Sequence, residues 1–179
     1  MNNTLLRYIC FSLLFGAVYV QPLLAAEAQG RYVTLQYSDK RMLREFNDKL
    51  IIGRKLSAMM RKKNVETVED EVVAKVDLVV EKTEVVLDMF PDKLQLTLVL
   101  LADDDDVEDK YLEKYGQRQD NIAFYSLSEN TIFISVDDTN LRVLAHEMGH
   151  AIADLYFEVR PPYKIHELMA QFAEKHITD

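Results

Sequence analysis

Hydrophobic positions follow two different periods along this chain, one typical of strands and one typical of helices. Apolar residues alternate from Tyr32 to Tyr37 and fill almost every position from Leu94 to Leu101, which predicts two strands, the second of them central. Between these strands, a period of three to four residues from Asp39 to Lys63 and from Thr67 to Phe90 predicts two long helices that form a hairpin. The many valines of the second segment would also suit a strand, but its length and period favour a helix.

Four consecutive aspartates, Asp103 to Asp106, precede a short helical pattern from Val107 to Tyr115. Oxygen ligands crowd there as in a calcium site, but the spacing and the glycine of an EF-hand loop are missing. We therefore expect a solvated turn that caps the helix. Two further strand patterns, from Ile122 to Ser126 and from Thr131 to Val136, surround a turn at residues 128–130 and predict a hairpin.

The segment from Leu141 to Phe157 is helical in pattern and carries the most informative motif of the chain. Residues four apart on a helix project from one face, so His146 and His150 can reach one metal ion. Glu147 projects about 100° away, too far round to ligate but close enough to touch a water bound to that ion. The pattern predicts catalytic zinc, and the alternative is a pair of histidines buried in the core. Asp138 or Thr139 is expected to cap this helix.

A catalytic zinc site usually takes three protein ligands, and the third is expected after the break at Pro161 and Pro162. A second helical pattern runs there from Tyr163 to His176. An antiparallel return would bring its first turns beside His150, which makes Glu167 the best geometric choice. Three other side chains of suitable chemistry are rivals: Glu174, His166 and His176.

The two-histidine motif, followed by Glu167-Leu168-Met169-Ala170, resembles the gluzincin group of zinc metallopeptidases, whose second helix carries an E-x-x-A pattern. Upstream, residues 121–126, the turn at 128–130 and residues 132–134 resemble the edge strand and hairpin that precede the zinc helix in thermolysin-like enzymes. The resemblance covers about the last third of the chain. In size the chain is similar to single-domain minigluzincins and to uncharacterised bacterial proteins described only as metallopeptidases.

The resemblance implies that His146, His150 and Glu167 bind Zn²⁺ and that Glu147 is the general base and acid. It also implies that an extended peptide or protein substrate lies antiparallel to the edge strand. The residues of that strand would be Ala123, Phe124 and Tyr125.

Two positions depart from the family pattern. Gln171 stands where thermolysin-like enzymes place an aspartate that orients a zinc histidine, and an amide raises ligand basicity less than a carboxylate. Asp154, one turn after His150, could supply the missing carboxylate. The larger enzymes also use a second domain for the residue that stabilises the oxyanion, and Tyr163 is the expected substitute here. Tyr156 and His166 are weaker candidates for the same role.

Residues 1–28 read as a secretory signal peptide: a weakly basic start, an apolar run from Tyr8 to Val20 and then small residues. Cleavage after Ala28 fits the small-residue rule, and cleavage after Ala26 is the close alternative. The rival is an uncleaved membrane anchor. Cleavage predicts a periplasmic or secreted protein without a thiol, because Cys10 is the only cysteine.

The remaining residues, 29–179, suit one domain, with a helical part at 29–92 and a part with the sheet and the zinc site at 93–179. A net charge of -9 argues against nucleic acid and anionic membrane as partners. We expect an α+β, zincin-like domain with a small mixed sheet, an active-site helix, a C-terminal glutamate helix and the N-terminal helical hairpin, which could bind a protein partner.

The leading functional expectation is an exported zinc endopeptidase that hydrolyses peptide bonds with Glu147 as base. One alternative is a zinc-binding interaction module on the same scaffold with little or no hydrolysis. Another is a structural exported protein whose histidines are part of the core.

Overall fold

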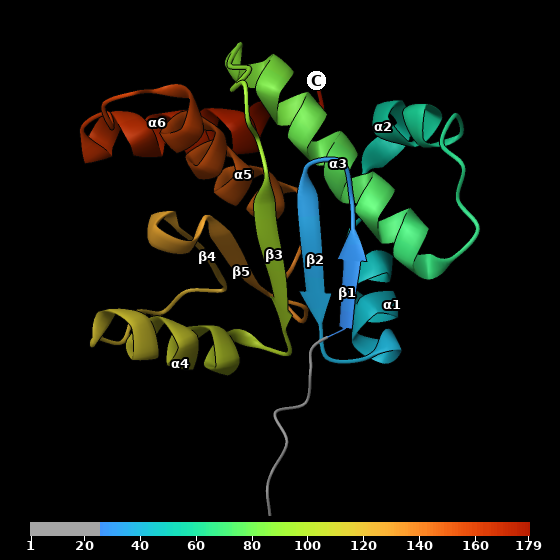
Figure 1. Ribbon diagram of the computed structural model, residues 1–179, viewed down its shortest axis with the longest axis horizontal. Coiled ribbons are helices and arrows are strands. Elements are labelled where there is room, and N and C mark those ends of the chain that lie inside the picture. Colours follow the sequence, from blue (N-terminus) through green and yellow to red (C-terminus); the bar gives the residue numbers. More distant parts are fainter. Residues whose placement is uncertain (1–25) are drawn as a thin grey trace, which may run out of the picture.

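A five-stranded mixed sheet forms the centre of the molecule in the computed structural model, which describes residues 26–179. The spatial order of the strands is β1, β2, β3, β5, β4. The three inner strands are parallel, whereas each edge strand runs antiparallel to its neighbour (Figure 1). Their bounds are β1 (Ala26–Gln29), β2 (Val33–Tyr37), β3 (Leu96–Leu101), β4 (Ala123–Ser126) and β5 (Thr131–Ser135).

Six α-helices accompany the sheet in the described part of the chain, so the domain is mixed α+β as expected. Their bounds are α1 (Lys40–Lys49), α2 (Gly53–Met60), α3 (Val68–Leu87), α4 (Asp104–Tyr115), α5 (Leu141–Tyr156) and α6 (Tyr163–His176), and a 3₁₀ turn spans Leu127–Glu129. Within residues 26–179, no helix combines the length and the apolar character needed to cross a membrane.

The two faces of the sheet are covered by different helices. One face packs against α1, α3 and α5 and forms the main core, in which Leu35, Leu98 and Ile132 are fully buried. The other face is covered by α4 only over β3, β5 and β4, where Phe124 and Phe133 stack with ring centroids 4.9 Å apart. Because β5 is covered on both faces, all five of its residues are buried. The prediction of a central β3 is confirmed.

The single long helix expected from Asp39 to Lys63 is wrong, and with it the long helical hairpin. The chain leaves α1 at Leu50, and α2 begins at Gly53, whose φ of +72° is a left-handed conformation that favours glycine. Leu50 and Ile52 are buried by this bend, whereas Ile51 is 75% exposed. Both short helices contact α3. The partner-binding role expected for this region stays a prediction.

The helix start signals decide where α3 and α4 begin. Thr67 and Asp70 form a reciprocal capping box at the start of α3, as the sequence suggested for Thr67. Asp103 is the N-cap of α4 and accepts a hydrogen bond from the backbone N–H of Asp106. Helix α4 therefore begins three residues earlier than expected, and the aspartates form its first turn, where negative charge is favourable.

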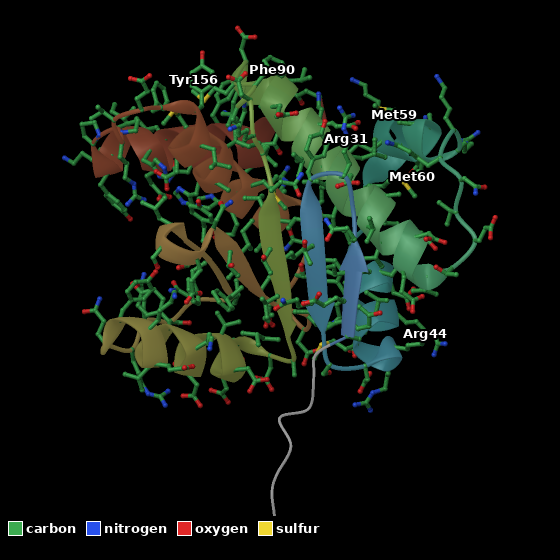
Figure 2. The ribbon with its side chains drawn as sticks, in the orientation of Figure 1. Arg31, Arg44, Met59, Met60, Phe90 and Tyr156 are labelled. Carbon is green, nitrogen blue, oxygen red and sulfur yellow. The ribbon has the colours of Figure 1, made fainter. Side chains whose placement is uncertain are left out.

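The turn between β1 and β2 is held by a carboxylate from α3. Asp77 accepts hydrogen bonds from the backbone N–H groups of Arg31 and Tyr32 at 2.8 and 3.0 Å. Burial raises the pKa of Asp77, while these two donors lower it. Gly30 fits here because an added Cβ would lie 2.8 Å from Val73 Cγ1. Figure 2 shows Arg31 at this turn beside α3.

Strand β1 was not predicted, and three of its four residues lie inside the expected leader. Its four residues pair with β2 from Ala26 opposite Tyr37 to Gln29 opposite Thr34. Cleavage after Ala28 would remove most of this strand, whereas cleavage after Ala26 would keep three of its residues. The rest of the expected signal peptide, including Cys10, lies outside the described residues.

Candidate metal centre

Helix α5 carries the two-histidine motif and is fixed by burial of its opposite face. Leu144, Met148 and Ile152 of this helix are fully buried in the main core. Its N-cap is Asn140, which accepts hydrogen bonds from the N–H groups of residues 142 and 143. The predicted caps at 138 and 139 are therefore wrong by one or two residues, because the chain uses the last side-chain acceptor before the helix.

Helix α6 returns along α5, and a glycine lets the two helices approach closely. A Cβ added to Gly149 would lie 2.9 Å from Ala170 Cα and 3.2 Å from Ala173 Cβ. These small residues bring the first turns of α6 beside the histidines of α5. The expected antiparallel return after Pro161 is thus confirmed, and it places Glu167 at the motif.

Three side chains converge as a possible metal-ligand group: His146, His150 and Glu167. The two Nε2 atoms lie 3.2 Å apart. The Glu167 carboxylate oxygens lie 3.5 Å from His146 Nε2 and 3.6 Å from His150 Nε2. Ligand atoms at the corners of a tetrahedral zinc site are separated by about 3.3 Å, because Zn–N and Zn–O distances are about 2.0–2.1 Å. The donor types suit a zinc ion, and the two distances to Glu167 involve different oxygens, with one ligand atom per residue all within 4.8 Å of one another.

Glu147 lies beside the ligand group rather than in it, as the motif predicted. Glu147 is 8% exposed, and the Tyr125 backbone N–H of strand β4 faces its carboxyl. The pKa of Glu147 is raised to about 8, mainly by burial and also by the negative charge of Glu167, while the Tyr125 N–H opposes this rise. A carboxyl in this range can both accept and release a proton near neutral pH.

The carboxylate that contacts His146 comes from Glu174, two turns after Glu167. Its Oε2 lies 3.1 Å from His146 Nδ1. The Nδ1–H of a histidine that binds metal through Nε2 needs such an acceptor. Glu174 was considered only as a rival ligand. Gln171, expected to orient a histidine, instead donates from Nε2 to Glu167 Oε1 at 3.2 Å and holds the third ligand.

The second histidine is contacted by His166 rather than directly by Asp154. His166 is 1% exposed, and its Nδ1 lies 2.8 Å from His150 Nδ1. Asp154, expected as the direct partner of His150, lies with Oδ1 3.0 Å from His166 Nε2. The pKa of His150 is lowered to about 3, first by burial and then by the nearby His146, His166 and Arg160, so the ring is neutral and able to ligate.

A cleft of about 460 Å³ opens over the ligand group. One wall is the edge strand β4 with aromatic residues of α4, where Tyr111 packs edge-on against Phe124 at 5.1 Å between ring centroids. The other wall is the start of α6, where Tyr163 is 77% exposed, together with Arg160. The structure therefore brings Tyr163 to the cleft. Tyr156, a weaker candidate for the same role, does not line it.

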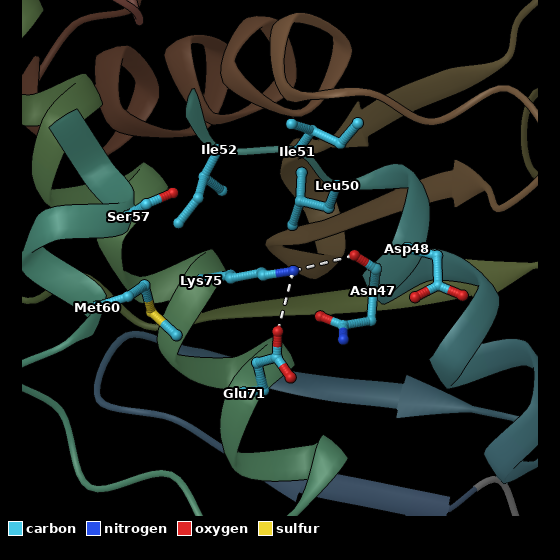
Figure 3. A pocket seen from close by; sticks show the side chains of 9 residues that line it. All are labelled: Asn47, Asp48, Leu50, Ile51, Ile52, Ser57, Met60, Glu71 and Lys75. Atoms are coloured by element: carbon cyan, nitrogen blue, oxygen red, sulfur yellow. Dashed lines mark hydrogen bonds and ion pairs between the residues drawn. The ribbon is translucent and has the colours of Figure 1, made fainter. Parts of the chain in front are cut away.

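A second hollow, of about 400 Å³, lies between α1, α2 and α3 (Figure 3). Its one cationic side chain, Lys75, donates to the Asn47 backbone carbonyl oxygen at 3.0 Å and pairs with Glu71 at 3.2 Å. Lys75 is paired in this way, whereas the buried Asn47 Oδ1 of the same hollow has no hydrogen-bond partner. Within residues 26–179, the ligand group of α5 and α6 is the one cluster suited to a metal ion.

The contacts of three residues near the metal-ligand group were not predicted: Glu174, His166 and Arg160. Glu174 is one heptad after Glu167, so a helical wheel places both on one face and could have identified it. Burial of His166 depends on the crossing of two helices and has no such signal. Rival ligand His176 lies away from the group and pairs with Asp179.

Comparisons with known proteins do not assign the chain to a family. No protein-family model, no curated protein and no solved structure matches the chain.

Proposed function

We propose that this chain is an exported, zinc-dependent endopeptidase of the gluzincin type. The observation that carries the proposal is the convergence of His146, His150 and Glu167 at zinc-ligand spacing, with the Glu147 carboxyl between this group and an edge strand. Export rests on the signal-peptide pattern of residues 1–28.

The chemistry assigned to each residue follows from its position. Bound zinc would supply a Lewis acid and a water acidified enough to attack a peptide carbonyl. Glu147 would take a proton from the attacking water and return it to the leaving amine, which suits a buried carboxyl with a raised pKa. Glu174 and Gln171 hold His146 and Glu167 in orientation through the contacts described above.

Strand β4 offers backbone groups to an extended substrate. The Ser135 N–H donates to the Ile122 carbonyl oxygen, so residues 122 and 124 are those that bond to β5 in the alternating antiparallel pattern. The backbone groups of Ala123 and Tyr125 consequently point to the free edge. A peptide added antiparallel to this edge would pair with Ala123 and with the Tyr125 carbonyl oxygen, since the Tyr125 N–H faces Glu147, and it would lie across the cleft.

Two cleft residues carry donors suited to a developing oxyanion. Tyr163 was expected from the sequence, and its hydroxyl is on an exposed side chain at the start of α6. Arg160 lines the same wall and is held at its Nε by Asp154 at 3.0 Å. Donors aimed at the oxyanion typically contribute about 10²–10³-fold in rate, so Tyr163→Phe and Arg160→Ala separate their contributions.

The experiment is metal analysis of the purified protein followed by peptide-library cleavage. One zinc per chain is expected in the wild type, with weaker binding in His146→Ala and Glu167→Ala. Glu147→Gln is expected to keep zinc and to lose hydrolysis by about 10²–10⁴-fold, since only the proton transfer is removed. Glu113→Gln, an exposed glutamate of α4, serves as the matched control.

Each outcome separates the proposal from its alternatives. Zinc binding without cleavage of any peptide would leave the zinc-binding interaction module. A wild-type protein that takes up no zinc after reconstitution would refute the metal site and the peptidase together. Cleavage by Glu147→Gln at the wild-type rate would refute the assignment of the base alone.

A further inference from the structure

A continuous line of buried polar contacts leads from the second histidine away from the metal-ligand group. His150 Nδ1 lies 2.8 Å from His166 Nδ1, and His166 Nε2 lies 3.0 Å from Asp154 Oδ1. The same oxygen lies 3.0 Å from Arg160 Nε. The side chains of His166 and Asp154 are 2% and 1% exposed, so water does not compete for these contacts.

The two histidine rings meet edge to edge. Their planes are 10° from parallel and their centroids are 4.8 Å apart. Rings stacked face to face are separated by about 3.5 Å or more, whereas the Nδ1 atoms of His150 and His166 are 2.8 Å apart. The rings therefore lie close to a common plane, which is the geometry of an N–H···N hydrogen bond.

The contacts allow one consistent placement of the protons when His150 binds a metal. A ligating Nε2 carries no proton, so His150 Nδ1 carries it and donates to His166 Nδ1. His166 must then carry its own proton on Nε2, which lies 3.0 Å from Asp154 Oδ1 in an ion-pair contact that is not aligned as a hydrogen bond, since Nε2 and both Asp154 oxygens have no hydrogen-bond partner. The opposite placement would set a lone pair of His166 against that carboxylate.

The buried carboxylate at the end of the line is compensated by charge. Asp154 would be costly to bury alone, and the Arg160 guanidinium 3.0 Å away supplies the opposite charge. The negative charge of an ionised Asp154, 3.0 Å from His166 Nε2, favours the tautomer of His166 with the proton on Nε2.

We propose that His166 is a positioning residue that relays the constraint of Asp154 to His150 and holds the Nε2 lone pair of His150 toward the metal. The inference rests on the metal site of the proposed function but not on its hydrolytic activity. It assigns His166 a role through another residue, distinct from the ligand role for which it was a rival.

The direct test is the protonation state of each ring nitrogen in the zinc-loaded protein. Long-range ¹H–¹⁵N correlation spectra of histidine-labelled protein resolve this, and the chain has only four histidines. The expected result is a proton on Nδ1 of His150 and a proton on Nε2 of His166. A proton on Nδ1 of His166 would overturn the relay.

Variants provide a second readout through zinc affinity, measured by competition with a chelator. His166→Phe keeps the ring shape but removes the acceptor, and it is expected to weaken zinc binding about 10–100-fold. His166→Asn places a carbonyl acceptor near the position of Nδ1 and is expected to recover most of that loss. His176→Asn, on the same helix but outside the ligand group, is the control and should bind zinc like the wild type.

The outcomes distinguish the relay from the site on which it depends. Equal zinc affinity in folded His166→Phe and in the wild type would overturn the relay while leaving the metal site intact. If His166→Phe does not fold, the wild-type spectrum and the affinity of His166→Asn still decide the matter. A wild type that binds no zinc would overturn both the metal site and the relay.

Discussion

Gly149 of α5 lies directly against the backbone of Ala170 in α6, and an added Cβ would stand 2.9 Å from Ala170 Cα. A side-chain rotation could not relieve such a contact, because Ala170 Cα is a backbone atom. The distance between the histidines of one helix and Glu167 of the other is therefore set by the absence of a single methyl group.

Gly149→Ala is expected to separate α5 and α6 and to weaken both stability and metal binding. Alanine would gain up to about 1 kcal/mol of helix propensity over glycine, but overpacking typically costs about 1–3 kcal/mol. We expect a net loss of stability in urea unfolding and weaker zinc binding in chelator competition. Arg142→Ala, an exposed change on the same helix, should alter neither. Stabilisation by Gly149→Ala with unchanged zinc binding would contradict this packing argument.

Glu174→Ala is expected to weaken zinc binding about 10–100-fold while the protein stays folded, because His146 Nδ1 loses its acceptor. Glu174→Gln retains an oxygen acceptor and should lie between the two. Zinc affinity measured beside that of Glu113→Gln checks this order. An unchanged affinity in Glu174→Ala would show that His146 is oriented by its packing alone.

The capping box of α3 predicts a pH-dependent contribution to stability. The side chain of Asp70 accepts hydrogen bonds from the backbone N–H groups of Thr67 and Glu66. Its hydrogen bonds with these two residues lower the pKa of Asp70 below its usual 3.8. A carboxyl with a lower pKa in the folded state stabilises above the unfolded pKa, and the contribution is lost as pH falls through the folded value. Asp70→Asn should therefore be less stable than the wild type at neutral pH.

The difference in stability between Asp70→Asn and the wild type should disappear in acid, at pH values below 3.8. Urea unfolding of both proteins at neutral pH and in acid measures this difference. Asp92→Asn, at an exposed aspartate outside the helices, is the control and should show no such closing gap. A gap that persists undiminished in acid would mean that the carboxylate charge is not what stabilises the cap.

The two cleavage sites that the sequence allows differ in how much of strand β1 they leave on the mature chain. A chain starting at Glu27 keeps three residues that pair with β2, whereas a chain starting at Gln29 loses nearly the whole strand. We expect the shorter chain to be less stable by roughly 1–3 kcal/mol, the net contribution of a few backbone hydrogen bonds. Urea unfolding of both chains measures this, and Glu27→Ala in the longer chain controls for the Glu27 side chain, which bonds Gln36. Equal stability would make β1 dispensable.

The elements with a strong local pattern could be predicted from the sequence. The continuous apolar run of β3, the start of α3 at Thr67 and the helical motif of α5 each depend on neighbours within one element. The two histidines of the ligand group belong here as well, because the spacing of His146 and His150 is fixed by the helix itself. The short helices α1 and α2 were missed because Gly53 interrupts a pattern whose period continues on both sides.

The surroundings of those residues, in contrast, depend on how separate elements pack against one another. Strand β1 is polar on its exposed face and weakly apolar on the other, so its pairing depends on β2 and Asp77 rather than on its own pattern. The contacts of Glu174 and His166 exist because Gly149 allows α6 to approach α5. Spacing along a helix determines which side chains can share a metal ion, whereas the packing between helices determines which groups hold those side chains in place.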